Sequence, residues 1–199
     1  MSKKNKIPVI TIEPKKGWKI LDWRELNVYR DLLYFMILRD INSLYKQTVL
    51  GFSWAIIRPV LNMIVFTLIF SGLAKIPSDN VPYPIFSYTA LVPWTYFSTA
   101  MTFSTQSLIS SSSIFTKVYF PRLIIPLTSI FSKLVDFVIA FCVLFVLMAW
   151  YRIMPTLNIL WIPLLMLPMI LTAAGMGMWL SAIAIQYLDI PHAIQYLSQ

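Results

Sequence analysis

Residues 38–59 read LRDINSLYKQTVLGFSWAIIRP, and the solvent around the chain changes within this stretch. Three charged residues come first, Arg39, Asp40 and Lys46. They are followed by an uncharged run that only Arg58 interrupts, and Trp54 precedes that arginine by four residues. An aromatic and a cationic side chain at the start of an apolar segment are typical of a helix that enters a bilayer. The stretch therefore predicts a boundary between a water-exposed N-terminal arm and a membrane domain.

The composition of the 199-residue chain is that of an integral membrane protein. Hydrophobic residues make up 58% of the sequence and charged residues 12%, which is too little polar surface for a water-soluble domain. Of the 16 lysines and arginines, 11 lie at or before Arg58, so the formal charge of +8 is concentrated in the N-terminal arm. The positive-inside rule explains this asymmetry better than nucleic-acid binding does, and it predicts a cytoplasmic N-terminus. We therefore expect no nucleic-acid partner.

The N-terminal arm has two predicted parts. Residues 1–20 form a basic cytoplasmic tail that lacks the apolar region and cleavage site of a signal peptide. Residues 21–48 form an amphipathic helix, whose start at Asp22 and Glu25 resembles a capping box. Its apolar stripe consists of Trp23, Leu26, Leu33, Ile37, Ile41 and Leu44. Such a helix lies on a membrane surface, with lipids as its partners, whereas packing on a soluble core is the alternative.

Four segments are long and apolar enough to cross a hydrocarbon core of about 30 Å. They are residues 52–74, 84–106, 123–151 and 157–186, which together make up a transmembrane domain over residues 52–186. The expected fold is an all-α, polytopic membrane helical bundle with an N-terminal interfacial helix. Residues 187–199 turn at Asp189 and Pro191 and then resume apolar spacing, so they predict the start of a cytoplasmic loop or of a fifth span in a truncated sequence.

Two features inside the predicted spans bear on helix packing. Lys133 and Asp136 are three residues apart, so they can pair on one helical face. Because each charge costs about 2.5–3.5 kcal/mol at the centre of a membrane helix, a pair turned toward the bundle interior is favoured over a proton or ion relay. Ala173, Gly177 and Ser181 repeat at four-residue spacing, which permits close approach of a second helix or exposure to lipid.

The loop over residues 107–122 combines aromatic and basic side chains and is expected to face the cytoplasm. It contains Phe115, Tyr119 and Phe120 together with Lys117 and Arg122. Two interpretations stay open. The aromatic side chains and the basic rim can offer a docking surface to a cytoplasmic partner, or the aromatic side chains can anchor the loop at the membrane interface.

The sequence contains no motif of a nucleotide-binding or hydrolytic site. It lacks the glycine-rich phosphate-binding loop, the paired histidines of a zinc protease and the serine elbow of a hydrolase. Its only histidine, His192, stands beside Asp189 near the end, where a solvated loop residue is favoured over a catalytic one. We predict no catalytic, metal-binding or cofactor-binding residue in this chain. If ATP powers a transport step, another polypeptide binds it.

Three stretches, taken in order, resemble one family. They are LRDINSLYKQTVLGFSWAIIRPVL at 38–61, VPWTYFS at 92–98 and KVYFPRLIIPL at 117–127. Together they resemble the permease subunit of a type-2 ABC exporter, in the branch that moves O-antigen, capsular or teichoic-acid polysaccharide across the bacterial cytoplasmic (inner) membrane. The resemblance extends from about Trp23 to the end of the chain.

The resemblance implies partners and a substrate. It implies a homodimer with six spans per subunit, of which this chain holds four, and two copies of a separate cytoplasmic ABC ATPase that binds ATP and Mg²⁺. It assigns the contact with this ATPase to a coupling segment, Thr116, Lys117, Tyr119, Phe120, Pro121 and Arg122. The implied substrate is a lipid-linked glycan, on polyprenyl pyrophosphate or a comparable lipid, that enters sideways. Candidates to line its conduit, unless they face lipid, are Phe66, Phe70, Trp94, Tyr96 and Phe97.

Other functions stay open at this point. A type-2 ABC exporter of drugs or small lipids differs only in its cargo. A membrane-embedded transferase acting on lipid-linked sugars needs acids or histidines gathered near one interface, whereas the eight acidic residues here are scattered. A third possibility is an inert scaffold or remnant. It is supported only by the difference between the four spans predicted here and the six of the family.

Overall fold

The computed structural model describes residues 27–46, 53–73, 77–78, 81–112 and 120–198. Over these residues the chain forms helices and no strand, which confirms the predicted all-α fold. The helices are α2 (Arg30–Lys46), α3 (Trp54–Phe66), the π-helix η2 (Thr67–Leu73), α4 (Tyr83–Ser110), α6 (Ile124–Trp150), the 3-10 helix η3 (Leu157–Trp161), α7 (Ile162–Ala184) and α8 (Ile190–Leu197).

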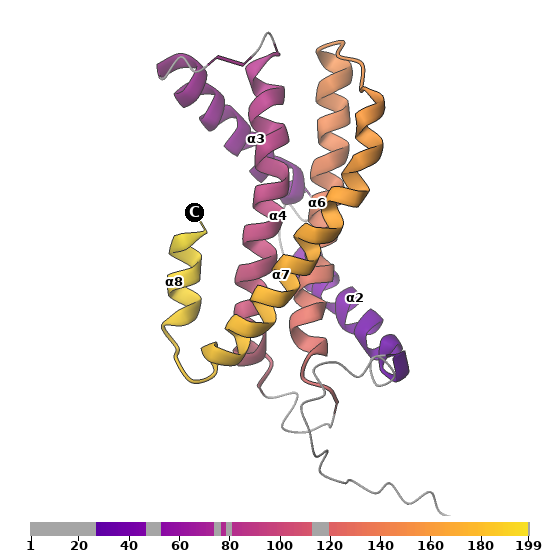
Figure 1. The fold of residues 1–199 in the computed structure, drawn as a ribbon, viewed down its shortest axis with the longest axis vertical. Helices are drawn as coiled ribbons and strands as arrows, with labels where there is room; N and C mark the ends of the chain where they lie inside the picture. The colour runs from indigo at the N-terminus through magenta and orange to yellow at the C-terminus, as the bar shows by residue number, and fades with distance from the viewer. Residues whose placement is uncertain (1–26, 47–52, 74–76, 79–80, 113–119, 199) are drawn as a thin grey trace, which may run out of the picture.

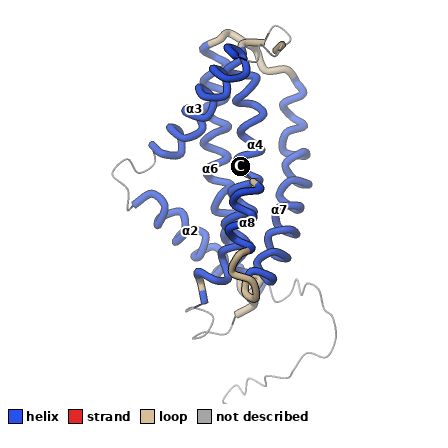
Figure 2. Tube along the Cα trace, turned by 90° about the vertical axis from the view of Figure 1, so that its left-hand side faces the viewer, coloured by secondary structure: helices blue, strands red, loops and turns tan. Residues whose placement is uncertain are grey.

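Helices α4, α6 and α7 form the centre of a bundle (Figure 1). Helices α4 and α6 run along its long axis, α7 crosses them obliquely, and α8 turns back beside α4. Successive helices from α4 to α8 alternate in direction, so residues 151–156 lie at one end of the bundle and residues 120–123 at the other. Helices α2 and α3 lie obliquely on one side of the bundle, where Figure 2 shows them diverging from it.

Three helices of the described chain are long and apolar enough to cross a membrane: Trp54–Gly72, Ile124–Trp150 and Leu157–Ala184. They correspond to the first, third and fourth predicted spans. Helix α4 corresponds to the second, and its 28 residues reach about 42 Å at about 1.5 Å per residue. Its many hydroxyl residues make it less apolar than the other three. Its role as a span therefore stays a prediction.

Several hydroxyl groups of α4 are bonded within the helix itself. Thr99, Thr105, Ser107 and Ser110 each donate a hydrogen bond to a backbone carbonyl three or four residues earlier, at 2.6–3.1 Å. This back-bonding satisfies a polar side chain without water. Helix α4 can therefore occupy the middle of the bundle in spite of its composition.

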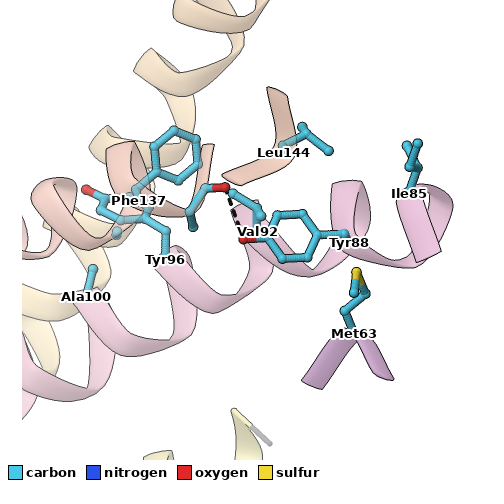
Figure 3. Close-up of a cluster of buried hydrophobic side chains, with 10 residues drawn as sticks. Met63, Ile85, Tyr88, Val92, Tyr96, Ala100, Phe137 and Leu144 are labelled. Carbon is cyan, nitrogen blue, oxygen red and sulfur yellow. Dashed lines mark hydrogen bonds between the residues drawn. The ribbon is translucent and has the colours of Figure 1, made fainter. Parts of the chain in front are cut away.

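The main core lies where α4 faces α6 (Figure 3). Tyr88 is fully buried, and its hydroxyl donates a hydrogen bond of 3.1 Å to the carbonyl of Ala140 on α6. The Tyr96 ring meets Phe137 edge to face, with centroids 5.6 Å apart. Met63 of α3 completes this layer from a third helix. These contacts fix α4 and α6 against each other in one register.

Helix α7 approaches α4 closely through its small residues. Ala173, Gly177 and Ser181 are buried, as expected for residues that permit helix contact. A Cβ atom added to Gly177 would lie 2.5 Å from Ser104 Oγ and 2.8 Å from Ser104 Cβ. Glycine is therefore the residue that allows this separation of the two helices.

Helix α6 ends in a Schellman motif with an arginine in the position that glycine usually takes. Ile153 N–H donates to the carbonyl of Met148, and Arg152 N–H donates to that of Ala149, at 2.9 and 3.2 Å. Arg152 has a φ of 57°, in the left-handed region. The helix therefore stops sharply before the 151–156 turn, at the cost of backbone strain in a non-glycine residue.

A second core joins α2 to the opposite end of the bundle. Met36 of α2 is buried against the side chains of Leu108, Phe120, Ile124 and Ile125. Further residues of α2 pack on the edge of this cluster, namely Tyr29, Leu32 and Leu33. Helix α2 is thus tied to the residues on both sides of the 113–119 segment.

Candidate functional site

A groove with charged residues lies between α3, α4 and α6, and we call it the charged groove. Its volume is about 400 Å³. Each helix contributes two polar residues to its lining: Arg58 and Asn62, Thr95 and Thr99, and Lys133 and Asp136. The wall is completed by aromatic and apolar side chains, among them Trp54, Leu91, Val92, Phe103 and Phe137. It is a mixed site, with polar groups that converge in largely apolar surroundings.

Helical spacing explains why these residues share one groove. On α3, residues 54, 58 and 62 are four apart, and so are residues 95, 99 and 103 on α4. On α6, Lys133, Asp136 and Ala140 follow one another at intervals of three and four. Such intervals place side chains on a single helical face. Packing of α3 and α6 against α4 then brings the three faces together.

The charges in the groove are held by specific contacts. Lys133 Nζ lies 3.4 Å from Asp136 Oδ2, and the Lys133 side chain is only 7% exposed. The same ammonium lies 4.0 Å above the centre of the Phe103 ring. The Arg58 guanidinium lies 5.6 Å from the centre of the Trp54 ring. Aromatic faces thus replace some of the water around both cations.

A smaller pocket of about 270 Å³ lies between α2, α4 and α6, and we call it the serine pocket. Arg39 and Asp40 of α2 line it as an ion pair with Nη2 and Oδ1 2.7 Å apart. Its remaining polar lining comes from α4 and α6: Gln106, Ser107, Ser110, Ser111, Thr128 and Ser129. Phe103 lines both this pocket and the charged groove. The two cavities therefore meet at one aromatic side chain.

The structure brings together the predicted pair, Lys133 and Asp136. It adds Arg58, Asn62 and the two threonines of α4, which the sequence reasoning did not assign to a site. The signal for Arg58 and Asn62 was their four-residue spacing behind Trp54 in an otherwise apolar run. The serine pocket could not be recognised in the sequence in this way, because each of three helices contributes only a few residues to its lining.

The predicted coupling segment is described only in part. Thr116, Lys117 and Tyr119 lie outside the described residues. Phe120 is 6% exposed and belongs to the core that joins α2 to the bundle, so its ring is not presented at the surface of this chain. Pro121 is half-buried and Arg122 is exposed.

The apolar stripe predicted for the interfacial helix falls on α2 and the residues before it. Trp23 and Leu26 lie outside the described residues, as does the side chain of Leu44. Leu33, Ile37 and Ile41 are half-buried. Among the described side chains of α2 the buried one is Met36, which the predicted stripe did not include. On the surface of the same helix, Tyr34 and Phe35 are exposed.

The five aromatic residues predicted for a conduit divide into two groups. Phe66 and Phe70 stack with centroids 5.4 Å apart, and Trp94 and Phe97 lie 6.2 Å apart. Phe66 and Trp94 are exposed, whereas Phe70 and Phe97 are half-buried. Tyr96 is different, since it is 3% exposed and packs on Phe137 inside the core. Four of the five candidates therefore retain exposed surface for a further partner.

Comparison with known proteins gives a family and three named relatives. The model of a family described as ABC-2 type transporter matches residues 31–193. An O-antigen export system permease protein RfbA from Myxococcus xanthus is 29% identical over 175 residues, which cover 87% of this chain and 66% of that protein. Two proteins of the same name from Klebsiella pneumoniae are each 29% identical over 161 residues, which cover 80% of this chain and 61% of theirs. The chain thus spans somewhat less than two thirds of the length of these relatives.

Proposed function

Because the chain belongs to the ABC-2 type transporter family, we propose that it is the permease subunit of an ATP-driven exporter of lipid-linked polysaccharide. The observation that carries this proposal is the likeness to proteins named O-antigen export permeases over at least 80% of the chain. The multi-pass bundle of apolar helices is the architecture that such a subunit requires. In this proposal the membrane is the bacterial cytoplasmic membrane, and the N-terminus lies on its cytoplasmic side.

The chemistry of ATP hydrolysis lies in a separate cytoplasmic ABC ATPase, which binds ATP and Mg²⁺. The permease contributes conformational change, with no catalytic step of its own. Its cytoplasmic end is then the end that holds residues 107–112 and 120–123. A partner docked there acts on the loop between α4 and α6, as the coupling assignment of residues 116–122 requires.

The packing of Phe120 supports a route for this coupling. Its ring is buried with Met36 of α2 and Ile124 of α6. A displacement of the loop therefore carries α2 and the start of α6 with it, because close-packed side chains move together rather than deform. Phe120 acts in this scheme as the link inside the permease, and contact with the ATPase falls to neighbouring residues of the segment.

Two copies of the permease form the conduit in this proposal. A polymer of sugars presents alternating apolar faces and hydroxyl groups, which suit a wall of aromatic rings. The pairs Phe66 with Phe70 and Trp94 with Phe97 are suitable, since each pair keeps exposed ring surface on this subunit. Tyr96 does not belong to this wall, because its ring lies in the core.

The test is to co-express the full chain with an ABC ATPase that co-purifies with it and to reconstitute both into vesicles. We expect ATP-dependent movement of a fluorescent polyprenyl-linked glycan, and none of a small hydrophobic drug. Movement of the drug alone would replace the polysaccharide assignment by a drug exporter. Turnover of a lipid-linked sugar by the chain without any ATPase would overturn the transport proposal.

A variant pair tests the coupling end. Arg122→Ala is expected to lower stimulation of the ATPase at least fivefold, while Arg152→Ala, which removes an exposed arginine at the other end of the bundle, leaves it unchanged. The melting temperature of both variants in detergent controls for folding. Equal stimulation by both variants would move the coupling site elsewhere.

A further inference from the structure

The charged groove combines features that point to an anionic ligand. Within it Arg58 and Lys133 supply two positive charges, and Asp136 supplies one negative charge. Over the described residues, Asp136 is the carboxylate that pairs with Lys133, and none forms an ion pair with Arg58. The described lining of the groove therefore carries a net charge of +1, in surroundings from which helices normally exclude charge. Ionisable residues inside a membrane domain are rare, and they mark substrate and ion pathways in many membrane proteins.

The cations are placed so that a ligand can reach them. Arg58 is exposed, and its contact in the structure is the face of the Trp54 ring. This cation–π contact uses none of the N–H donors of the guanidinium, so they can make a bidentate contact with phosphate oxygens. Lys133 lies deeper, and the hydrogen bond that it donates to Asp136 is long at 3.4 Å. An ammonium has three donors, so a ligand oxygen can add to this contact.

The neutral groups of the groove fit the same ligand. The amide of Asn62 supplies two N–H donors, and the hydroxyl of Thr95 supplies one more. A phosphate or pyrophosphate accepts hydrogen bonds at all its outer oxygens, so donors from α3 and α4 would surround it on two sides. The volume of about 400 Å³ exceeds what one phosphate needs and leaves room for an attached group.

The groove also borders on an apolar surface. Leu91, Val92 and Ala140 line it beside the polar groups. On α3, the neighbouring Leu61 and Val65 are about half exposed, at 51% and 50%. A molecule with an anionic head and a hydrocarbon chain would place its head in the groove and its chain along this surface. A free anion would leave the apolar part of the lining unused.

We propose that the charged groove binds the phosphate or pyrophosphate headgroup of a polyprenyl lipid, through Arg58 and Lys133 as cationic contacts and Asn62 and Thr95 as neutral donors. This assignment rests on the proposed function, since a lipid-linked glycan carries such a headgroup. Asp136 positions the Lys133 ammonium when the groove is empty. Phe103 covers the same ammonium on the side of the serine pocket, so the headgroup is reached from α3.

The experiment measures binding to the full chain in lipid nanodiscs. The probes are undecaprenyl pyrophosphate, the neutral alcohol undecaprenol, and inorganic pyrophosphate. We expect the pyrophosphate lipid to bind at least tenfold more tightly than either of the others. Equal affinity for undecaprenol would exclude recognition of the headgroup. Equal affinity for inorganic pyrophosphate would assign the groove to a free anion and overturn the lipid assignment.

Two variants test the named residues. Arg58→Gln keeps an exposed polar side chain and is expected to weaken binding of the pyrophosphate lipid at least tenfold, whereas Arg152→Gln, outside the groove, leaves it unchanged. Asn62→Leu is a second variant, expected to weaken binding about threefold, in case Arg58→Gln fails to fold. Unchanged affinity in the folded variants would overturn the proposal.

The outcome is separable from that of the proposed function. Transport of the glycan lipid together with unaltered headgroup binding in Arg58→Gln would leave the function intact and refute the groove. Tight, Arg58-dependent binding of the pyrophosphate lipid without transport would support the groove and refute the function.

Discussion

Gly177→Ala is expected to push α7 away from α4, although alanine is the better helix former. The added Cβ would lie 2.5 Å from Ser104 Oγ and 2.8 Å from Ser104 Cβ. Ordinary contact distances are about 3.5–4.0 Å, so the two helices must separate by about 1 Å. Ser104 Oγ can turn away about χ1, but Ser104 Cβ is fixed to the backbone and cannot. The strain therefore falls on the backbones.

The magnitude follows from a matched control. Overpacking of this kind costs about 1–3 kcal/mol, while replacing glycine by alanine within a helix gains about 1 kcal/mol. Gly175→Ala, two residues away, introduces a Cβ with no heavy atom within 4 Å and so receives the gain alone. When the unfolding free energies of the two variants are subtracted, the gain in helix propensity cancels and the steric cost remains. Gly175→Ala is therefore expected to be the more stable variant by about 1–3 kcal/mol.

The assay is reversible unfolding in mixed detergent, monitored by the circular dichroism signal of the helices. Ser104→Gly removes both obstructing atoms, so the double variant Ser104→Gly with Gly177→Ala is expected to recover most of the loss, as a double-mutant cycle would show. Ser104→Ala would recover little, because its Cβ remains. If Gly177→Ala and Gly175→Ala unfold at the same denaturant concentration, the inference that α4 and α7 pack too closely for a Cβ at residue 177 is refuted.

Three further changes test single contacts. Ser104→Ala removes a buried hydroxyl that has no hydrogen-bond partner among the described residues, so it is expected to leave the unfolding free energy unchanged or to raise it by up to about 1 kcal/mol in the same assay; a clear decrease would contradict the orphaned hydroxyl. Tyr88→Phe deletes the hydrogen bond to the Ala140 carbonyl and is expected to lower the unfolding free energy by about 0.5–1.5 kcal/mol, while an unaffected stability would show that the bond contributes nothing. Arg152→Gly relieves a φ of 57° and is expected to raise stability by about 0.5–1 kcal/mol, measured against Arg152→Ala, which keeps the strain; equal values would refute it.

Hydropathy alone predicted the helical fold because the apolar segments are long and uninterrupted. It could not rank those segments by burial. Helix α4 is the least apolar of the four and the most central, since it contacts α3, α6, α7 and α8. Its place depends on hydroxyl groups that bond to their own backbone, and such local satisfaction leaves no mark on a hydropathy average.

Which way an individual side chain faces was the part least accessible from the sequence. Tyr96 and Phe97 are neighbours with similar chemistry, yet the first lies in the core and the second keeps exposed surface, because consecutive residues on a helix point about 100° apart. Phe120 is a further example, since its burial depends on α2, about 80 residues earlier in the chain. Lys133 and Asp136 could be paired from the sequence because their contact lies within one helix. Arg58 required the packing of α3 on α6 to be placed beside them.

The modest hydropathy of α4 also bears on how the protein is made. A nascent helix leaves the translocon sideways according to its own preference for lipid, and polar residues shift that preference toward the aqueous channel. Helix α4, the second predicted span, emerges before α6 and α7, the helices that cover most of its surface. We therefore expect its lateral release to be completed after α6 has been synthesised, when the Tyr88 hydroxyl can donate to the Ala140 carbonyl. A substitution in α6 that breaks these contacts is accordingly expected to impair the insertion of α4.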